Sequence, residues 1–182
     1  MKKFEEITGW FSVEDSKTYQ YLITNIPEDG TIVEIGCWLG KSSSFLADAK
    51  KPNQKIICVD TWEGSASELE TNHTLVKTHD IYEIFKDNMG DRDYQAIKKP
   101  SVEAAKSFED NSLDAVFIDA EHTYNAVKAD IEAWYPKLKN GGYISGHDYD
   151  RNWPEVRRAV NDCFKGRLVK EGMFGCCWVV KK

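Results

Sequence analysis

The residues best suited to chemistry lie in two short stretches, Asp119–Tyr124 and His147-Asp148. Asp119 follows a continuously apolar run, so its carboxylate leaves a buried strand and needs an ammonium group, a metal ion or a substrate hydroxyl as partner. His122 can accept a proton near neutral pH, because an unperturbed imidazole has a pKa of about 6.5. A loop histidine bonded to a backbone carbonyl is the alternative interpretation of His122. The pattern predicts proton transfer or cation binding at two strand ends.

A glycine turn ending in Gly-Lys-Ser forms a second candidate site. Gly36 and Gly40 are four positions apart, whereas a Walker A phosphate loop needs glycines five apart. A dinucleotide-binding turn needs glycine where this chain has Trp38. The spacing therefore argues against ATP and NAD. The carboxylate of Glu34 and the indole favour a ligand that carries a positive charge and no phosphate.

Short apolar runs alternate with helical patterns along the chain, and this alternation positions both candidate sites. The predicted strands are Thr31–Ile35, Lys55–Val59, Tyr94–Lys98, Asp114–Ile118, Tyr143–Ser145, Arg167–Lys170 and Phe174–Val180. The predicted helices are Lys41–Lys50, Thr71–Met89, Val102–Phe108, Asn125–Leu138 (stopped by Gly141-Gly142) and Trp153–Phe164. We expect an α/β fold: a doubly wound, mostly parallel, Rossmann-like sheet with helices on both faces and a C-terminal antiparallel hairpin. Ligands of such sheets bind beyond the carboxyl ends of the strands.

Length and composition bound the possible functions. The 182 residues predict a single domain, 1–182, in which residues 1–25 form an N-terminal helical cap. A net charge of −6 argues against nucleic acid as a partner, because a nucleic-acid binder needs a basic face. No signal peptide or bilayer-length apolar run is apparent, so we expect a cytoplasmic protein without a membrane partner. The five cysteines are interpreted as buried, reduced thiols.

Four motifs in order resemble those of class I S-adenosylmethionine-dependent methyltransferases. Val33–Gly40 is similar to the family's first motif, E/D-x-G-x-x-x-G, and Ile57–Trp62 to the motif of the second strand. Asp114–His122 and Gly141–Tyr149 resemble the fourth and fifth strands of the small O-methyltransferase branch, which includes catechol and sugar O-methyltransferases. The resemblance covers about Ile26 to Tyr149. It implies S-adenosylmethionine as cofactor.

The resemblance also implies roles for individual residues. In the family, the acid at the end of the second strand binds the ribose hydroxyls, which here is Asp60, and Ser101 stands where a residue meets the adenine edge. The metal-dependent members have an acidic pair where this chain has His147-Asp148. The implied cofactor-binding residues are Glu34, Gly36, Trp38, Gly40, Ser42, Asp60, Thr61, Trp62, Ser101 and Asp119. The candidate catalytic residues are Asp119, His122 and His147, and the candidate ligands of a divalent Mg or Mn ion are Asp119, His147 and Asp148.

These residues together predict O-methylation of a small hydroxylated acceptor, such as a sugar or a phenol. Removal of the acceptor proton by a histidine and by a metal ion both remain open. Segment Glu63–His79 is expected to form a wall over the substrate, and Ser42 to cap the following helix. Either the acceptor is small or the protein forms a homodimer. The alternatives are an NAD-dependent oxidoreductase or epimerase, and a non-catalytic binding protein with a degenerate methyltransferase fold.

Overall fold

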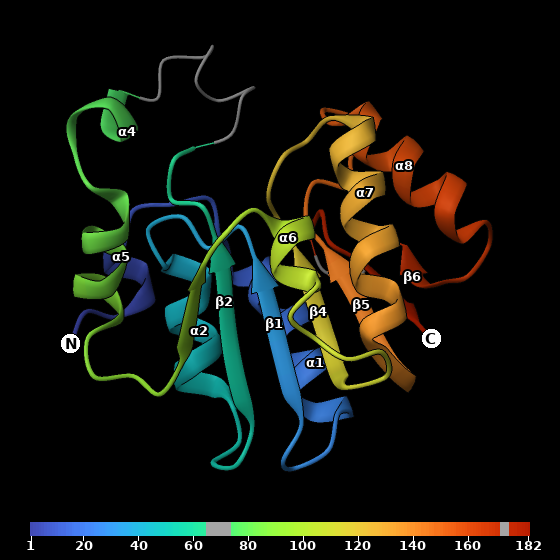
Figure 1. Cartoon of the computed structure of the whole chain (residues 1–182), viewed down its shortest axis with the longest axis horizontal. Helices are drawn as coiled ribbons and strands as arrows, with labels where there is room; N and C mark the ends of the chain where they lie inside the picture. The colour runs from blue at the N-terminus through green and yellow to red at the C-terminus, as the bar shows by residue number, and fades with distance from the viewer. Residues whose placement is uncertain (65–73, 172–174) are drawn as a thin grey trace.

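Within the residues that the structure describes, seven strands form one sheet in the order β3-β2-β1-β4-β5-β7-β6 (Figure 1). The computed structural model describes residues 1–64, 74–171 and 175–182. The strands are β1 (Thr31–Ile35), β2 (Lys55–Asp60), β3 (Gln95–Lys98), β4 (Leu113–Ile118), β5 (Leu138–Gly146), β6 (Leu168–Glu171) and β7 (Trp178–Lys181). The first five run parallel, and β7 pairs antiparallel with both β5 and β6. The predicted mostly parallel sheet with a closing hairpin is therefore confirmed, with Phe174 of the last predicted strand outside the described residues.

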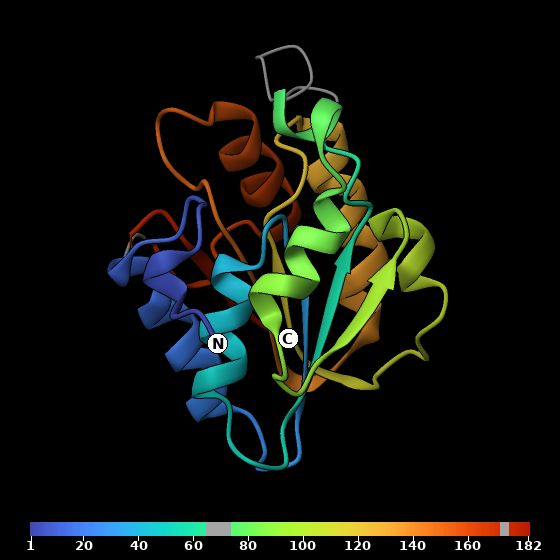
Figure 2. The ribbon, with the colours of Figure 1, turned by 90° about the vertical axis from the view of Figure 1, so that its left-hand side faces the viewer.

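Helices cover both faces of this sheet (Figures 1 and 2). The first face packs against α1, α2 and α5, and the second against α6, α7 and α8. The bounds are η1 (Phe4–Glu6), α1 (Val13–Asn25), α2 (Lys41–Ala49), α4 (Thr74–Thr78), α5 (Ile81–Met89), α6 (Ser101–Ala105), α7 (Tyr124–Trp134), η2 (Tyr135–Lys137) and α8 (Pro154–Phe164). No helix among the described residues is long and apolar enough to cross a bilayer.

The two longest predicted helices were wrong in extent, and the helix expected over Val102–Phe108 is α6, which ends at Ala105. The helix expected over Asn125–Leu138 ends at Trp134. Gly141-Gly142, which were expected to stop this helix, lie inside β5. Pro136 explains the early end, because proline has no N–H to continue the α-helical hydrogen bonds, and the chain passes into the short 3-10 helix η2. The helix expected over Thr71–Met89 is two helices, α4 and α5, because Asp80 adopts an extended conformation and caps α5. Residues 71–73 lie outside the described part of the chain.

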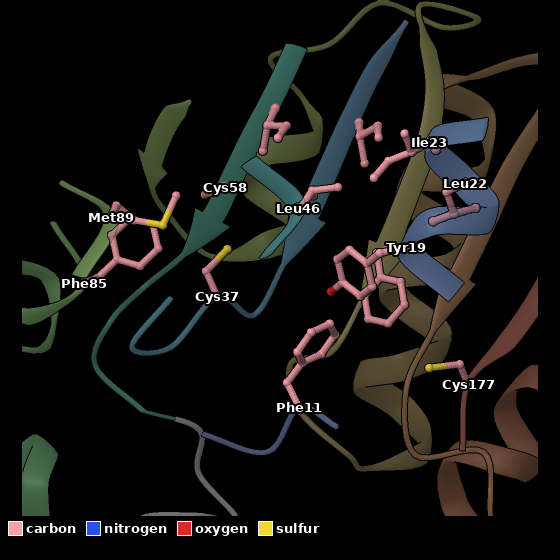
Figure 3. Close-up of a cluster of buried hydrophobic side chains, with 14 of the residues drawn as sticks. Phe11, Tyr19, Leu22, Ile23, Cys37, Leu46, Cys58, Phe85, Met89 and Cys177 are labelled. Carbon is pink, nitrogen blue, oxygen red and sulfur yellow. The ribbon is translucent and has the colours of Figure 1, made fainter. Parts of the chain in front are cut away.

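A buried carboxylate ties the N-terminal helix to the first strand. Glu34 of β1 is completely buried and receives hydrogen bonds from Tyr19 of α1, at 2.7 Å, and from Ser43 of α2. Burial raises the pKa of Glu34, and these hydroxyl donors offset part of the shift. Tyr19 lies in the aromatic and aliphatic cluster drawn in Figure 3, where side chains of α1, α2 and α5 meet over the sheet. Glu34 is thus a structural group at the centre of one face.

Replacing Tyr19 with Phe removes one donor from this buried acid. We expect Tyr19→Phe to lower the free energy of unfolding by roughly 1–3 kcal/mol, because Glu34 then keeps a desolvated oxygen without that bond. Urea unfolding of the two proteins measures the change. Tyr21→Phe, which removes the hydroxyl of a less buried tyrosine on the same helix, is the matched control. Equal effects of the two changes would contradict the role given to the bond with Glu34.

Candidate active site

One cavity of about 640 Å³ opens at the carboxyl ends of β1, β2, β4 and β5. This volume lies within the usual range of small-molecule sites, roughly 300–1,000 Å³. Its lining combines the glycine turn after β1, the loop after β2, the start of α6 and the polar residues after β4 and β5. Thr8–Phe11 of the N-terminal segment and Trp153 complete the lining. The two candidate sites of the sequence are therefore parts of a single cavity.

The glycine turn is pressed directly against the end of β4. Gly36 has φ +85°, and a Cβ at this position would lie 1.8 Å from the carbonyl oxygen of Asp119. No other residue fits there. Gly40, at φ +86°, is the N-cap of α2, which begins at Lys41. Ser42 is therefore inside the first turn. The prediction that Ser42 caps the helix was wrong, because the left-handed backbone that starts the helix requires the glycine.

Asp60 joins the glycine turn to the loop after β2. Its Oδ2 accepts the backbone N–H of Trp38 at 2.8 Å, and its Oδ1 accepts the backbone N–H of Trp62 at 2.7 Å. The indole of Trp62 donates to the carbonyl of Trp38 at 3.0 Å, which closes the arrangement. Each carboxylate oxygen has a second lone pair, so Asp60 can also accept hydrogen bonds from a ligand in the cavity.

The structure brings most of the expected cofactor-binding residues to the cavity, though not all of them. The cavity lining includes Gly36, Trp38, Ser42, Asp60, Thr61, Ser101 and Asp119. Three others are outside the lining: Glu34, Gly40 and Trp62. Glu34 is completely buried. Trp62 is 3% exposed, and it donates its backbone N–H to Asp60 and its indole N–H to the carbonyl of Trp38. Their observed contacts are with the protein.

All four polar residues predicted at the ends of β4 and β5 line the cavity. Nδ1 of His147 lies 3.3 Å from Oδ1 of Asp148 and 3.9 Å from Oδ1 of Asp119. Nε2 of the same ring faces the other way, 3.4 Å from Oδ1 of Asp15 and 3.1 Å from Sγ of Cys176. His147 is thus surrounded by three carboxylates and a thiol.

His122 forms the second half of this cluster. Its Nε2 lies 2.9 Å from Oδ2 of Asp148, so the two oxygens of Asp148 face one histidine each. The ring of His122 stacks on the exposed indole of Trp153, with centroids 4.2 Å apart. Asp148 has φ +59°, a conformation that is uncommon for a residue other than glycine. The surrounding structure therefore holds Asp148 in the position that bridges both rings.

Burial and charge shift the pKa values within the cluster. Burial raises the pKa of Asp119 to about 7, against the opposing effect of His147. Burial by itself would lower the pKa of His147, but Asp119 and the hydrogen bonds to Asp148 and Asp15 raise it well above the ordinary value. Burial would likewise raise the pKa of Asp148, and hydrogen bonds from both histidines hold it below its usual range. Near neutral pH, His147 is an imidazolium ion and Asp148 a carboxylate.

Sequence analysis missed three polar residues of this region. Asp15 of α1 and Cys176 contact His147, but they lie far from it in the chain and no local motif marks them. Asp130 of α7 lines the cavity. A signal for Asp130 was available, because it occupies the buried helix face that also carries Val127, Ile131 and Trp134. A carboxylate on an apolar helix face needs a partner or a ligand.

Comparisons with known proteins agree with this geometry. The sequence profile described as "Methyltransferase domain" matches residues 33–149. An uncharacterized protein of Acanthamoeba polyphaga mimivirus is 32% identical over 140 residues, which are 74% of this chain and 59% of that protein. An uncharacterized protein of Sinorhizobium fredii is 30% identical over 124 residues, which are 64% of this chain and 13% of that protein. The chain thus spans less than two thirds of the length of either relative.

Two solved O-methyltransferases have similar folds. The structure of the O-methyltransferase NovP has a TM-score of 0.73 at 14% identity, covering 94% of this chain and 80% of that one. The TDP-rhamnose 3'-O-methyltransferase of calicheamicin biosynthesis has a TM-score of 0.62 at 15% identity, covering 91% and 76%. At these identities the likeness concerns the fold. Together with the profile match over most of the chain, it shows that this chain belongs to the methyltransferase domain family and has the Rossmann-like fold of S-adenosylmethionine-dependent O-methyltransferases.

Proposed function

We propose that this protein transfers the methyl group of S-adenosylmethionine to a hydroxyl oxygen of a small acceptor. One observation carries the proposal: two groups of residues line a single cavity. The first is Asp60 at the end of β2, where the acid of the family binds the ribose hydroxyls, and the second is the cluster of carboxylates and imidazoles at the ends of β4 and β5. The contact between Gly36 and Asp119 fixes these two regions next to each other. A cofactor seated on the glycine turn then presents its methyl group to the cluster.

The charges in the cavity suit this cofactor. Asp119, Asp148 and Asp15 bring more negative charge than the imidazolium of His147 neutralises. S-adenosylmethionine carries a sulfonium and an ammonium group, which complete the balance, whereas the phosphates of ATP or NAD would meet carboxylates. We assign the ammonium group to Asp119 and the ribose hydroxyls to Asp60. The remaining lining residues of the turn, Trp38 and Ser42, enclose the methionine part.

Methyl transfer forms a bond between the acceptor oxygen and the methyl carbon while the bond from that carbon to sulfur breaks. Sulfur keeps the electron pair, which leaves S-adenosylhomocysteine, and the acceptor hydroxyl must lose its proton. His122 is the proton acceptor in this scheme: Asp148 accepts a hydrogen bond from its Nε2, as a carboxylate does when it orients a histidine base, and Nδ1 of the same ring takes the proton. His147 already holds its proton and instead balances the charge of Asp119 and Asp148. Alignment of the acceptor contributes the rest of the rate.

The donor atoms in this cluster also fit a divalent cation. Atoms of Asp119, His122 and Asp148 all lie within 4.8 Å of one another, and two carboxylates with one imidazole suit Mn²⁺ or Zn²⁺ at least as well as Mg²⁺. These three residues would hold the ion, with His122 in place of His147, the ligand expected from the sequence. A bound cation would acidify the acceptor hydroxyl.

The acceptor itself is a small hydroxylated molecule in this proposal, such as a sugar or a phenol. Trp153 and Trp10 line the cavity, and both are exposed, at 39% and 65%. Exposed aromatic rings at the mouth of a cavity offer flat apolar faces to a sugar or an aromatic ring. The similar calicheamicin enzyme acts on a rhamnose hydroxyl, as its name states. We further propose that residues 1–182 work as one domain, with 1–25 as a cap that contacts His147 through Asp15.

Ligand binding is the first test. We expect calorimetry to detect binding of S-adenosylhomocysteine but not of ATP or NAD, since the turn lacks the spacing for a phosphate. Asp60→Ala should weaken the binding of S-adenosylhomocysteine by roughly 2–4 kcal/mol, because two charged hydrogen bonds are lost. Asp93→Ala, at an exposed carboxylate paired with Lys50, is the control. Tighter binding of NAD or ATP would refute the proposed cofactor.

Asp119 should make stability depend on pH. Its pKa is raised in the folded protein to about 7 from an ordinary value of 3.8, so the folded state binds more protons than the unfolded state between these values. The contribution of Asp119 to the free energy of unfolding therefore falls as the pH rises from about 4 to 7. Asp119→Asn should flatten this slope in urea unfolding at pH 5 and pH 8. Asp110→Asn changes a surface carboxylate paired with Lys137, and this variant should show the same pH dependence of the free energy of unfolding as the wild type.

Asp148 is needed by both routes of proton removal. Asp148→Ala should abolish methyl transfer while S-adenosylhomocysteine affinity stays within about threefold, a difference below roughly 1 kcal/mol. Asp150→Ala, two residues further along, should keep activity. Chelator treatment with elemental analysis then separates the routes: turnover without metal assigns the proton to His122, and loss that Mn²⁺ restores assigns a cation to the cluster. An active Asp148→Ala variant would exclude both.

A further inference from the structure

A buried acid in the lining of the cavity has no part in the mechanism above. Asp130 lies on α7, is 5% exposed and contributes to the cavity lining. It lies inside α7, beyond the loop that carries His122, and is not one of the residues directly after β4 or β5. A carboxylate that is this deeply buried in contact with a ligand cavity needs a hydrogen-bond donor, because an unpaired buried charge is costly.

The protein supplies one donor to this carboxylate. The hydroxyl of Ser101, the first residue of α6, hydrogen-bonds to Asp130. Ser101 Oγ also accepts the indole N–H of Trp134 at 2.9 Å, so its single proton is directed to Asp130. Burial raises the pKa of Asp130 to about 6, and no cationic group within the described residues opposes that shift. At neutral pH the result is an oriented carboxylate with capacity for a further donor.

The surroundings of Asp130 fit a flat ring. Val102, Ala126 and Ala129 line the cavity beside it, and these small apolar side chains come from two helices, α6 and α7. Asp60 and Thr61 line the same cavity at the end of β2. A nucleoside whose ribose meets Asp60 can therefore place its base between α6 and α7.

We infer that Asp130 accepts a hydrogen bond from the 6-amino group of the cofactor's purine, with Ser101 as a positioning residue that acts through it. This inference rests on the proposed function, because it takes S-adenosylmethionine as the cofactor. The 6-amino group is the one N–H donor on the adenine ring that remains after attachment to ribose, whereas its ring nitrogens are acceptors and would repel a carboxylate. Ser101 was expected to meet the adenine edge, and in this arrangement its hydroxyl does so through Asp130.

The test compares two ligands on two proteins by calorimetry. The ligands are S-adenosylhomocysteine and its analogue in which hydrogen replaces the purine 6-amino group. The wild type should prefer the amino ligand by roughly 10- to 150-fold, the value of one hydrogen bond to a charged group. Asp130→Ala should reduce this preference to within about threefold, mainly by weakening S-adenosylhomocysteine. Glu132→Ala, an exposed acid on the same helix, should keep the preference of the wild type.

Ser101→Ala provides a second route to the same contact. It leaves the carboxylate in place but removes the donor that orients it, so we expect a preference between those of the wild type and Asp130→Ala. A thermal melt of each variant identifies any that has not folded. A wild-type preference retained in Asp130→Ala or in folded Ser101→Ala would overturn the inference. Failure of S-adenosylhomocysteine to bind the wild type would instead refute the proposed function.

Discussion

The close contact between Gly36 and Asp119 is the constraint on which the site depends. β1 lies between β2 and β4, and the register pairs Ile35 with both Val59 and Ile118, so the three strands end side by side. The backbone after β4 then occupies the space that a side chain at position 36 would need. Only glycine permits the turn and the polar loop to touch. The distance between the glycine turn and the polar residues after β4 is therefore fixed by backbone packing.

Charge balance is the second constraint. His147 lies among Asp15, Asp119 and Asp148, and their attraction exceeds the cost of burying its charge. Removing one partner of such a group leaves others uncompensated, which is usually more damaging than the loss of a surface ion pair. The positive charge of His147 also explains how the carboxyl groups of Asp119 and Asp148 can lie near each other. The pKa of Asp119 is raised and that of Asp148 is lowered.

The sequence predicted the parts of this structure that depend on local patterns. β1 was predicted to the residue, because the apolar run Thr31–Ile35 ends at a glycine turn. The predicted helix end at Leu138 was wrong because Pro136, which cannot continue an α-helix, comes before the glycines that were expected to stop it, and α7 ends at Trp134. The expected helix cap at Ser42 failed because serine letters alone do not show that the preceding glycine has a left-handed backbone.

Residues that act at a distance could not be predicted in this way. The two carboxylates that Ser101 and His147 contact, Asp130 and Asp15, come from helices that no motif links to them. Of these two, only Asp130 is marked by a local sequence pattern, because it is an acid on the apolar face of α7. Such contacts depend on how helices pack on the sheet, and a single sequence records packing only through its periodicity.

The position of Cys176 has a consequence for how the site comes into being during synthesis. A ribosome releases the segments of β1, β2, β4 and β5 first, and the sheet up to β5 can pair as it emerges. His147 meets Asp15 from the beginning of the chain and Cys176 from just before β7, both outside the profile match at residues 33–149. β7 then adds to the edge of β5. The nascent chain consequently carries the glycine turn and its paired strands before His147 can meet Cys176 and before β7 can join β5.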